Sequence, residues 1–156
     1  MTALTVRRAG PDDAEGISAL VLALTPVFFD DPDAALPEPV QASLLPDGCS
    51  ARLADPAYTS WVATRAGELI GYAALFERRH VYHLFVDEAH HRQGVARALW
   101  SAVLRECDPG PITVRSSRVA VPVYRRFGFT ERGGLETKFG LTFQLMVLER
   151  DTADTP

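Results

Sequence analysis

The 156-residue chain has few cysteines and no long apolar segment, and each absence excludes a class of protein. Cys49 and Cys107 lie far apart, without the spacing of a disulfide framework or a metal site. The longest apolar run, Ala19 to Leu24, is too short to span a bilayer, and the acidic residues that flank it are atypical of a signal peptide. We therefore expect a protein of the reducing cytoplasm, with no metal ion and no membrane partner.

The net charge of −4 conceals two regions of opposite charge. Residues 1–57 contain nine acids and three arginines, whereas residues 78–132 contain ten arginines and five acids. A polyanionic ligand would be attracted to the second region. Nucleic acid is not expected as a partner, because this acidic chain has no basic stripe interleaved with aromatic residues.

With 47% hydrophobic residues, the chain can form one core, so we expect a single domain over residues 1–150 and a polar tail over 151–156. Six prolines between Pro26 and Pro56 predict a segment without long regular elements. The expected strands are Leu4–Arg8, Thr59–Thr64, Glu68–Phe76, His80–Val86, Ile112–Val114, Thr130–Arg132 and Leu141–Leu148. The expected helices are Pro11 to about Leu24, Pro39–Leu45, Val95–Glu106 and about Val119–Phe127. The last strand could also pair across a homodimer.

The polar loop over residues 86–96 joins a predicted strand to a predicted helix and ends in small residues. The first N–H groups of a helix have no intrahelical partner, and the helix dipole places partial positive charge there, so this loop is expected to bind phosphate. A dinucleotide site also follows a strand with a glycine loop, but it requires G-x-G-x-x-G. No third glycine follows Gly94, which argues against that site.

Two segments carry a family resemblance. His91-Arg92-Gln93-Gly94-Val95-Ala96 resembles the acetyl-CoA signature of GCN5-related N-acetyltransferases (GNAT), Gln/Arg-x-x-Gly-x-Gly/Ala, with histidine at the first position. The segment from Ser117 to Phe129 resembles the second signature, Asn-x-x-Ala-x-x-x-Tyr-x-x-x-Gly-Phe, with Ser117 in place of Asn and Tyr124 at the tyrosine. The signatures occur in the family's order, and the resemblance covers roughly Leu4 to Leu148.

The resemblance implies an α+β (mixed α/β) fold. Its central, mostly antiparallel seven-stranded sheet would be splayed between the fourth and fifth strands and flanked by about four helices. Acetyl-CoA, the cosubstrate, would lie in the split, and its pantetheine arm would pair with the strand edge. The implied cofactor-binding residues are Phe85, Val86, His91, Arg92, Gln93, Gly94, Val95, Ala96, Arg97, Ser117 and Tyr124.

The implied reaction is direct attack of a primary amine on the thioester. An alkylammonium group with a pKa of ~10.4 is almost fully protonated at pH 7, so a base or a water chain must take its proton. His80 occupies the strand position where relatives have a glutamate or histidine base, and His83 is a second candidate. Tyr124 matches the family tyrosine that meets the departing sulfur. A surface role for His80 and a core role for Tyr124 remain alternatives.

Regular alternation in the strand would direct one set of side chains to one face, His80, Tyr82, Leu84 and Val86, and the other set to the opposite face, Val81, His83 and Phe85. The two histidines could then not share a metal ion. A bulge, which the family commonly has near the end of this strand, would redirect the residues after it.

The acceptor is less defined than the cofactor. Phe28, Phe29 and Tyr82 are candidate substrate-binding residues, although the two phenylalanines could equally close the core. Because the acidic residues of 1–57 would border the acceptor site, the charge distribution favours a small cationic amine. Both small-molecule and protein amines stay open. A non-catalytic acyl-CoA-binding or sensing module is the alternative function.

Overall fold

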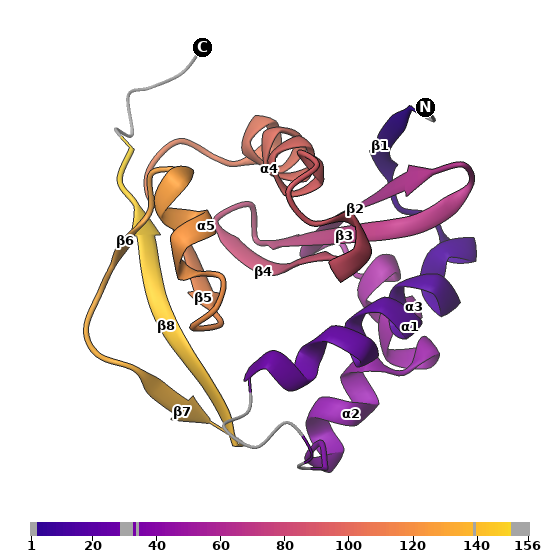
Figure 1. The fold of residues 1–156 in the computed structure, drawn as a ribbon, viewed down its shortest axis with the longest axis horizontal. Helices are drawn as coiled ribbons and strands as arrows, with labels where there is room; N and C mark the ends of the chain where they lie inside the picture. The colour runs from indigo at the N-terminus through magenta and orange to yellow at the C-terminus, as the bar shows by residue number, and fades with distance from the viewer. Residues whose placement is uncertain (1–2, 29–32, 34, 139, 151–156) are drawn as a thin grey trace.

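The structure, a computed structural model, describes residues 3–28, 33, 35–138 and 140–150. The predicted tail 151–156 and Phe29 lie outside these ranges, as does the side chain of Phe28. The strands are β1 (Leu4–Arg8), β2 (Tyr58–Arg65), β3 (Glu68–Phe76), β4 (His80–Val86), β5 (Ile112–Ser116), β6 (Thr130–Glu131), β7 (Glu136–Lys138) and β8 (Leu141–Leu148) (Figure 1). The α-helices are α1 (Ala14–Leu24), α2 (Glu38–Leu44), α3 (Pro46–Ala54), α4 (Val95–Glu106) and α5 (Val121–Arg126). Short 3-10 helices are η1 (Pro11–Asp13), η2 (Thr25–Phe28) and η3 (Glu88–His90).

The sheet has the predicted mixed, mostly antiparallel architecture. Its eight strands follow the order β1-β2-β3-β4-β5-β8-β6, with β7 paired to β8. Every neighbouring pair among the described strands is antiparallel except β4 and β5. One strand more than predicted is present, because the chain folds back at Gly140 and pairs β7 with the start of β8. The fold class predicted from the sequence is confirmed.

The proline-rich segment is more helical than the sequence predicted. Pro39 lies in the first turn of α2, and Pro46 is the first residue of α3. The first amides of a helix have no intrahelical acceptor, so proline, which lacks the N–H, is tolerated there. These prolines therefore begin helices. The first was predicted as Pro39–Leu45, whereas α3 was missed because Pro46 was interpreted only as a helix breaker.

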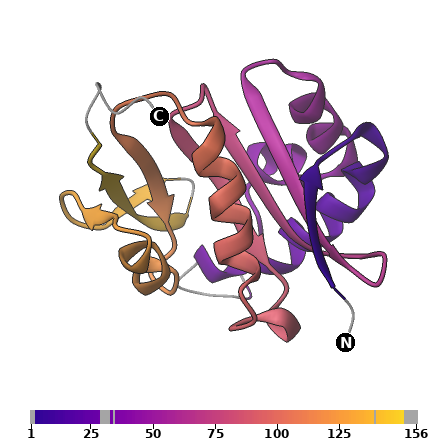
Figure 2. The same cartoon turned by 90° about the horizontal axis from the view of Figure 1, so that it is seen from above.

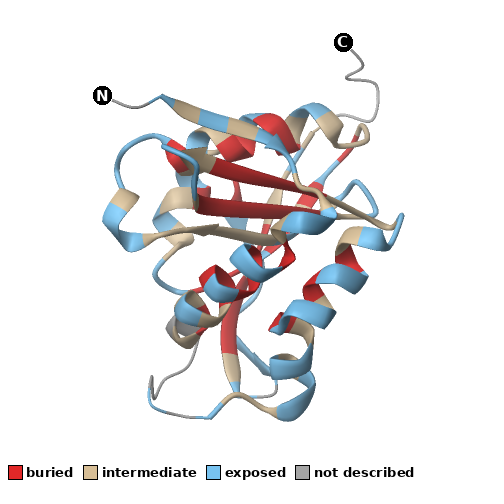
Figure 3. Ribbon diagram, turned by 90° about the vertical axis from the view of Figure 1, so that its right-hand side faces the viewer, coloured by how far each residue is buried: buried red, intermediate tan, exposed pale blue. Residues whose placement is uncertain are grey.

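Helices cover both faces of the sheet (Figure 2). α4 and α5 pack on one face, around a core that includes Leu99, Ile112 and Tyr124. α1, α2 and α3 pack on the other, around Ile17 and Tyr72. Figure 3 shows buried strand segments between these two helical layers. We call the two sides of the sheet the α4 face and the α1 face.

A β-bulge at Tyr82 changes the side-chain alternation of β4. In the pairing with β3, His83 lies opposite Ala74 but Val81 lies opposite Leu75, so Tyr82 is an extra residue. Val81 packs in the core of the α4 face, and so do Leu84 and Val86. The predicted alternation, which separated Val81 from these two residues, is therefore wrong. The bulge lies near the start of β4, whereas the resemblance implied one near its end.

Strand β8 has partners on both sides within the chain. β5 pairs with residues 144–148 on one side, and on the other β6 pairs with residues 146–147 and β7 with residues 141–143. Most of the strand is therefore paired within one chain, and its pairing across a homodimer stays a prediction. Within the described ranges, no helix is both long and apolar enough to cross a membrane.

Candidate active site

The sheet opens between β4 and β5. These strands pair only at their first residues, His80 with Thr113 and Val81 with Val114. β5 then follows β8 along its whole length, while β4 stays with β3. The edge of β4 that faces β5 is therefore left unpaired beyond the first two residues, as the predicted split requires.

Val86 presents its backbone groups at this open edge. The Asp87 N–H donates to the Ile70 carbonyl of β3 at 2.8 Å, so Asp87 faces β3. Because consecutive residues of an antiparallel strand face opposite edges, the N–H and C=O of Val86 face away from β3 and those of Phe85 face toward it. The Phe85 ring packs on the α1 face, with its centroid 5.2 Å from that of His83. Of the two predicted strand-edge residues, Val86 has the backbone orientation that a pairing ligand requires.

The loop after β4 is shaped by two residues with positive φ. Asp87 first caps η3 with its side chain. Arg92 and Gly94 then adopt φ values of 62° and 81°. Arg92 carries a side chain in a conformation that usually favours glycine, and Gly94 occupies it without strain. The chain is thereby turned so that α4 begins at Val95.

The start of α4 offers unpaired backbone donors. The first intrahelical bond runs from the Ala98 N–H to the Gly94 carbonyl at 3.0 Å. The preceding amides of Val95, Ala96 and Arg97 have no acceptor in the described part of the chain. A Cβ placed on Gly94 would meet no atom within 4 Å, so the space beside these amides is open. Together with the dipole of a 12-residue helix, these donors form a site suited to phosphate.

Side chains of the first signature hold this loop in place. His91 Nε2 lies 2.8 Å from the Val86 carbonyl and must be the donor, because a carbonyl only accepts. Gln93 accepts from Arg65, whose Nη1 also lies 3.2 Å from His90 Nδ1. His91 therefore links the loop to the end of β4 from the position where the family usually has glutamine or arginine.

The second signature forms the start of α5 and its buried aromatic face. Ser117 is buried, and its Oγ accepts from the Ala120 N–H at 3.2 Å, so it holds the turn that precedes the helix. Tyr124 is 5% exposed and packs edge-on against Phe127 and Phe129, with ring centroids 6.2 and 5.5 Å away. Burial raises the pKa of the Tyr124 phenol well above its ordinary value.

His80 lies where β4 and β5 meet, on the α1 face. Its Nδ1 is 2.7 Å from Thr113 Oγ1, and Thr113 alternates with the core residues Ile112 and Val114 of the α4 face. Burial, aided by the nearby Arg115 guanidinium, lowers the pKa of His80 to about 4. His80 is therefore neutral at pH 7.

His83 faces the same side but is more enclosed. Its ring lies against Tyr72, with centroids 5.8 Å apart, and its Nδ1 is buried without a hydrogen-bond partner among the residues described. Burial lowers the pKa of His83 well below its ordinary value, and the positive charge of Arg52 adds to this effect. Because of the bulge, both histidines lie on the α1 face, which the regular alternation did not predict. No group of three potential metal ligands occurs in the described ranges.

Arg52 is a buried residue of this face that sequence reasoning missed. Its side chain, on α3, is only 6% exposed, and Nη2 donates to the Ser43 carbonyl at 2.8 Å. The guanidinium lies 5.1 Å from the centroid of the Tyr82 ring, and its buried Nη1 has no acceptor within the described part of the chain. Tyr82 itself is 37% exposed, so this candidate substrate residue is accessible. The available signal was that Arg52 is the sole basic residue between Arg8 and Arg65.

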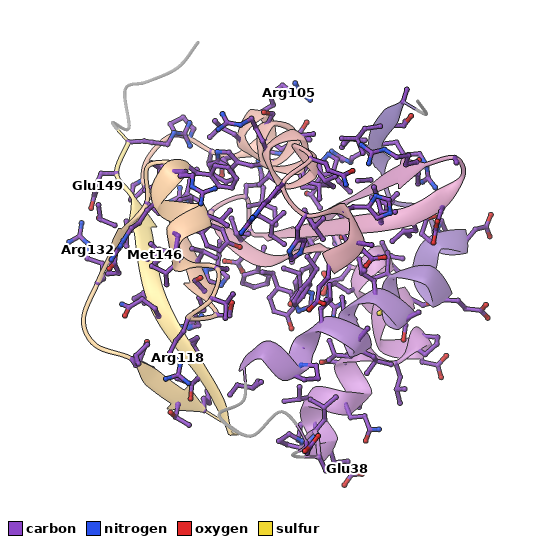
Figure 4. The ribbon with its side chains drawn as sticks, in the orientation of Figure 1. Glu38, Arg105, Arg118, Arg132, Met146 and Glu149 are labelled. Atoms are coloured by element: carbon purple, nitrogen blue, oxygen red, sulfur yellow. The ribbon has the colours of Figure 1, made fainter. Side chains whose placement is uncertain are left out.

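The acids that motivated a cationic acceptor are dispersed. Asp13 is paired with Arg7 at 2.8 Å, and this pairing lowers the pKa of the Asp13 carboxyl group. Glu38 projects outward from α2 at one end of the molecule (Figure 4), and Asp30 and Asp31 lie outside the described residues. Three acids line a cavity between the N-terminal ends of α1 and α3: Asp12, Glu15 and Asp47.

Comparison with known proteins gives one family. Residues 31–150 match the family model described as the acetyltransferase (GNAT) domain. The fold is similar to that of a GCN5-related N-acetyltransferase from Rhodopseudomonas palustris, with a TM-score of 0.76, 21% identity and coverage of 96% of this chain and 97% of the other. No curated protein matches the chain at a significant level.

Two further solved structures resemble the fold. One is the PaiA N-acetyltransferase from Thermoplasma acidophilum in complex with coenzyme A, with a TM-score of 0.72, 12% identity and coverage of 94% of this chain and 99% of the other. The second is the ribosomal-protein-S18-alanine N-acetyltransferase from Escherichia coli, with a TM-score of 0.67, 16% identity and coverage of 97% and 96%. At these identities the similarity shows the fold alone.

Proposed function

The chain belongs to the GNAT family of acetyltransferases, and on this premise we propose that it is an N-acetyltransferase that acts on a primary amine by direct attack on the thioester. The family uses acetyl-CoA as its cosubstrate, which supplies the acetyl group as a thioester. One observation carries the proposal. The unpaired amides at the start of α4 follow the end of β4, whose edge toward β5 is open from Tyr82 to Val86, and His80 lies at the closed end, where β4 pairs with β5.

The residues at the start of α4 fit the phosphates of the cosubstrate. Its pyrophosphate would accept from the free amides of Val95, Ala96 and Arg97, with Gly94 leaving room for close approach. The backbone N–H of Val86 would donate at the open edge of β4, while the Val86 carbonyl already accepts from His91. The exposed Arg92 and Gln93 flank this site, and we assign Phe85 a packing role on the α1 face.

His80 is the proposed proton acceptor. Because its pKa is about 4, it is neutral at pH 7 and can receive a proton without first losing one. Full transfer from an alkylammonium group of pKa ~10.4 would be uphill by roughly 9 kcal/mol, so His80 cannot deprotonate the free ammonium efficiently. The attacking nitrogen becomes much more acidic once its new bond to the acetyl carbon has formed. We therefore propose that His80 accepts the proton that this nitrogen then loses. His83, enclosed and without a partner for Nδ1, is the weaker candidate.

Tyr124 is proposed to donate a hydrogen bond to the departing sulfur. A thiol has a pKa of ~8.5 and a phenol one of ~10, and burial raises that of Tyr124 further. Proton transfer to the thiolate is therefore unfavourable, whereas a hydrogen bond to the developing negative charge is strong. Tyr124 thus stabilises the leaving group without losing its proton.

An assay across amine classes tests the proposed function. The protein is incubated with acetyl-CoA and amino acids, polyamines, aminoglycosides or peptides, and free CoA and the acetylated product are measured. Amine-dependent CoA release with formation of an amide is the expected result. Saturable acetyl-CoA binding without turnover on any amine would favour a non-catalytic acyl-CoA-binding module. We keep the cytoplasm as the proposed location, since both cysteines are free thiols.

A further inference from the structure

A cavity of about 390 Å³ opens on the α1 face beside Arg115. Thr113, which contacts His80, and Arg115 are two residues apart on β5, so their side chains project from the same face about 7 Å apart. Arg115, which lines the cavity, therefore projects beside the residue that His80 contacts. Its lining comes from β5, β7 and β8: Arg115, Glu136, Thr137, Lys138 and Phe143.

Arg115 is held in this cavity without a carboxylate partner. Its guanidinium lies over the Phe143 ring, 5.6 Å from the centroid, which restricts the side chain and leaves its N–H groups available. Among the described residues no acid pairs with it. Lys138, the only lysine of the chain, and Glu136 line the same cavity.

We propose that the acceptor amine carries a carboxylate and that Arg115 binds this group in the cavity over Phe143. The inference rests on the proposed function and names its substrate class: an amino acid or the carboxyl end of a short peptide. Arginine presents paired donors that match a carboxylate, and a side chain already held by an aromatic ring loses little freedom on binding. Glu136 disfavours a second negative charge, so the acceptor has one carboxylate beside its amine.

This assignment differs from the small cationic amine that the charge distribution of residues 1–57 favours. Several of those acids line the separate cavity between α1 and α3. The side chains nearest to His80 on β5 are Thr113 and Arg115, and neither is acidic. A carboxylate on the acceptor also offsets the positive charge of Arg115. A purely cationic acceptor would instead place its ammonium group near this uncompensated positive charge.

The experiment compares amino acids with their carboxamides, which keep the amine and lose the negative charge. kcat/KM is measured for each pair in the wild type, Arg115→Met, Arg115→Lys and the control Arg105→Met, whose exposed side chain projects from α4 (Figure 4). The wild type should prefer the acid about tenfold or more. Arg115→Met should bring the acid-to-amide ratio close to one, chiefly through KM. Arg115→Lys should keep part of the preference, and Arg105→Met all of it.

A binding measurement separates this inference from the proposed function. In the presence of CoA, an amino acid that the enzyme accepts should raise the melting temperature of the wild type but not that of folded Arg115→Met. Equal use of acids and amides, or an unchanged ratio in Arg115→Met, would overturn the inference while acetyl transfer stands. If no amine is acetylated, the proposed function fails. The inference would then be overturned as well if no carboxylate-bearing amine raised the melting temperature of the wild type.

Discussion

The two faces of the sheet differ in how their functional groups are specified. On the α4 face the cosubstrate would be bound largely by backbone amides at the start of α4, and the conformation that exposes them depends on neighbouring residues such as Gly94. On the α1 face the groups around His80 are single side chains from β4, β5, α3 and β8. A short segment of sequence can encode the first arrangement. The second depends on tertiary structure, so its chemistry can vary while the cofactor side stays the same.

The largest effect should follow from placing a charge on the α4 face. We expect Gly94→Glu to abolish the increase in melting temperature that acetyl-CoA produces, because its carboxylate would occupy the phosphate site. Gly133→Glu is the matched control, since Gly133 also has a positive φ, 68°, and open space around a Cβ. It should cause similar backbone strain but leave the ligand-induced shift intact. A normal shift in folded Gly94→Glu would disprove the cofactor assignment.

On the α1 face, His80→Gln should lower kcat by about 100-fold, the typical contribution of a positioned general base. His83→Gln should have a much smaller effect on kcat, because His83 Nδ1 is enclosed. In the wild type, kcat/KM should rise with pH toward the pKa of the amine, without an inflection near 6.5, since the pKa of His80 is about 4. Equal losses in the two variants would reject His80 as the proton acceptor.

Tyr124→Phe tests the buried phenol on the α4 face. The variant should bind CoA normally and lose about tenfold or more in kcat, because the lost hydrogen bond forms only as the sulfur becomes negative. Calorimetry for CoA and steady-state kinetics measure the two quantities. Wild-type turnover would mean that the buried phenol serves only the aromatic packing with Phe127 and Phe129.

A further expected effect is a dependence of stability on pH. Unfolded histidine has a pKa near 6.5, and folding lowers that of His80 to about 4, so between these values the unfolded chain binds a proton that the folded chain does not. Stability should therefore fall as the pH drops below 6.5, by about 2 kcal/mol from His80 between pH 7 and 5. Thermal melts of His80→Gln should show a smaller decrease over this range. An identical decrease in His80→Gln would show that other groups control the acid sensitivity.

The same contrast explains what could be predicted from the sequence. The strands and the helix that flank the cofactor loop were predicted nearly to the residue, because apolar periodicity and Gly94 are local signals. The bulge at Tyr82 was misplaced, since it appears only in the register between β3 and β4. α3 and its residue Arg52 were missed because a proline that begins a helix resembles one that breaks it. The association of Arg115 with Phe143 depends on the pairing of β5 with β8, which no local pattern reveals.

Labelled acetyl-CoA tests most directly whether the acetyl group passes straight from the thioester to the amine in the split between β4 and β5. The enzyme is mixed with acetyl-CoA labelled in the acetyl group, with and without an accepted amine, and the label is followed by mass spectrometry. We predict label in the amide product when the amine is present, and neither labelled protein nor CoA release when it is absent. A burst of CoA equal to the enzyme concentration without amine, with label retained on the protein, would contradict the account.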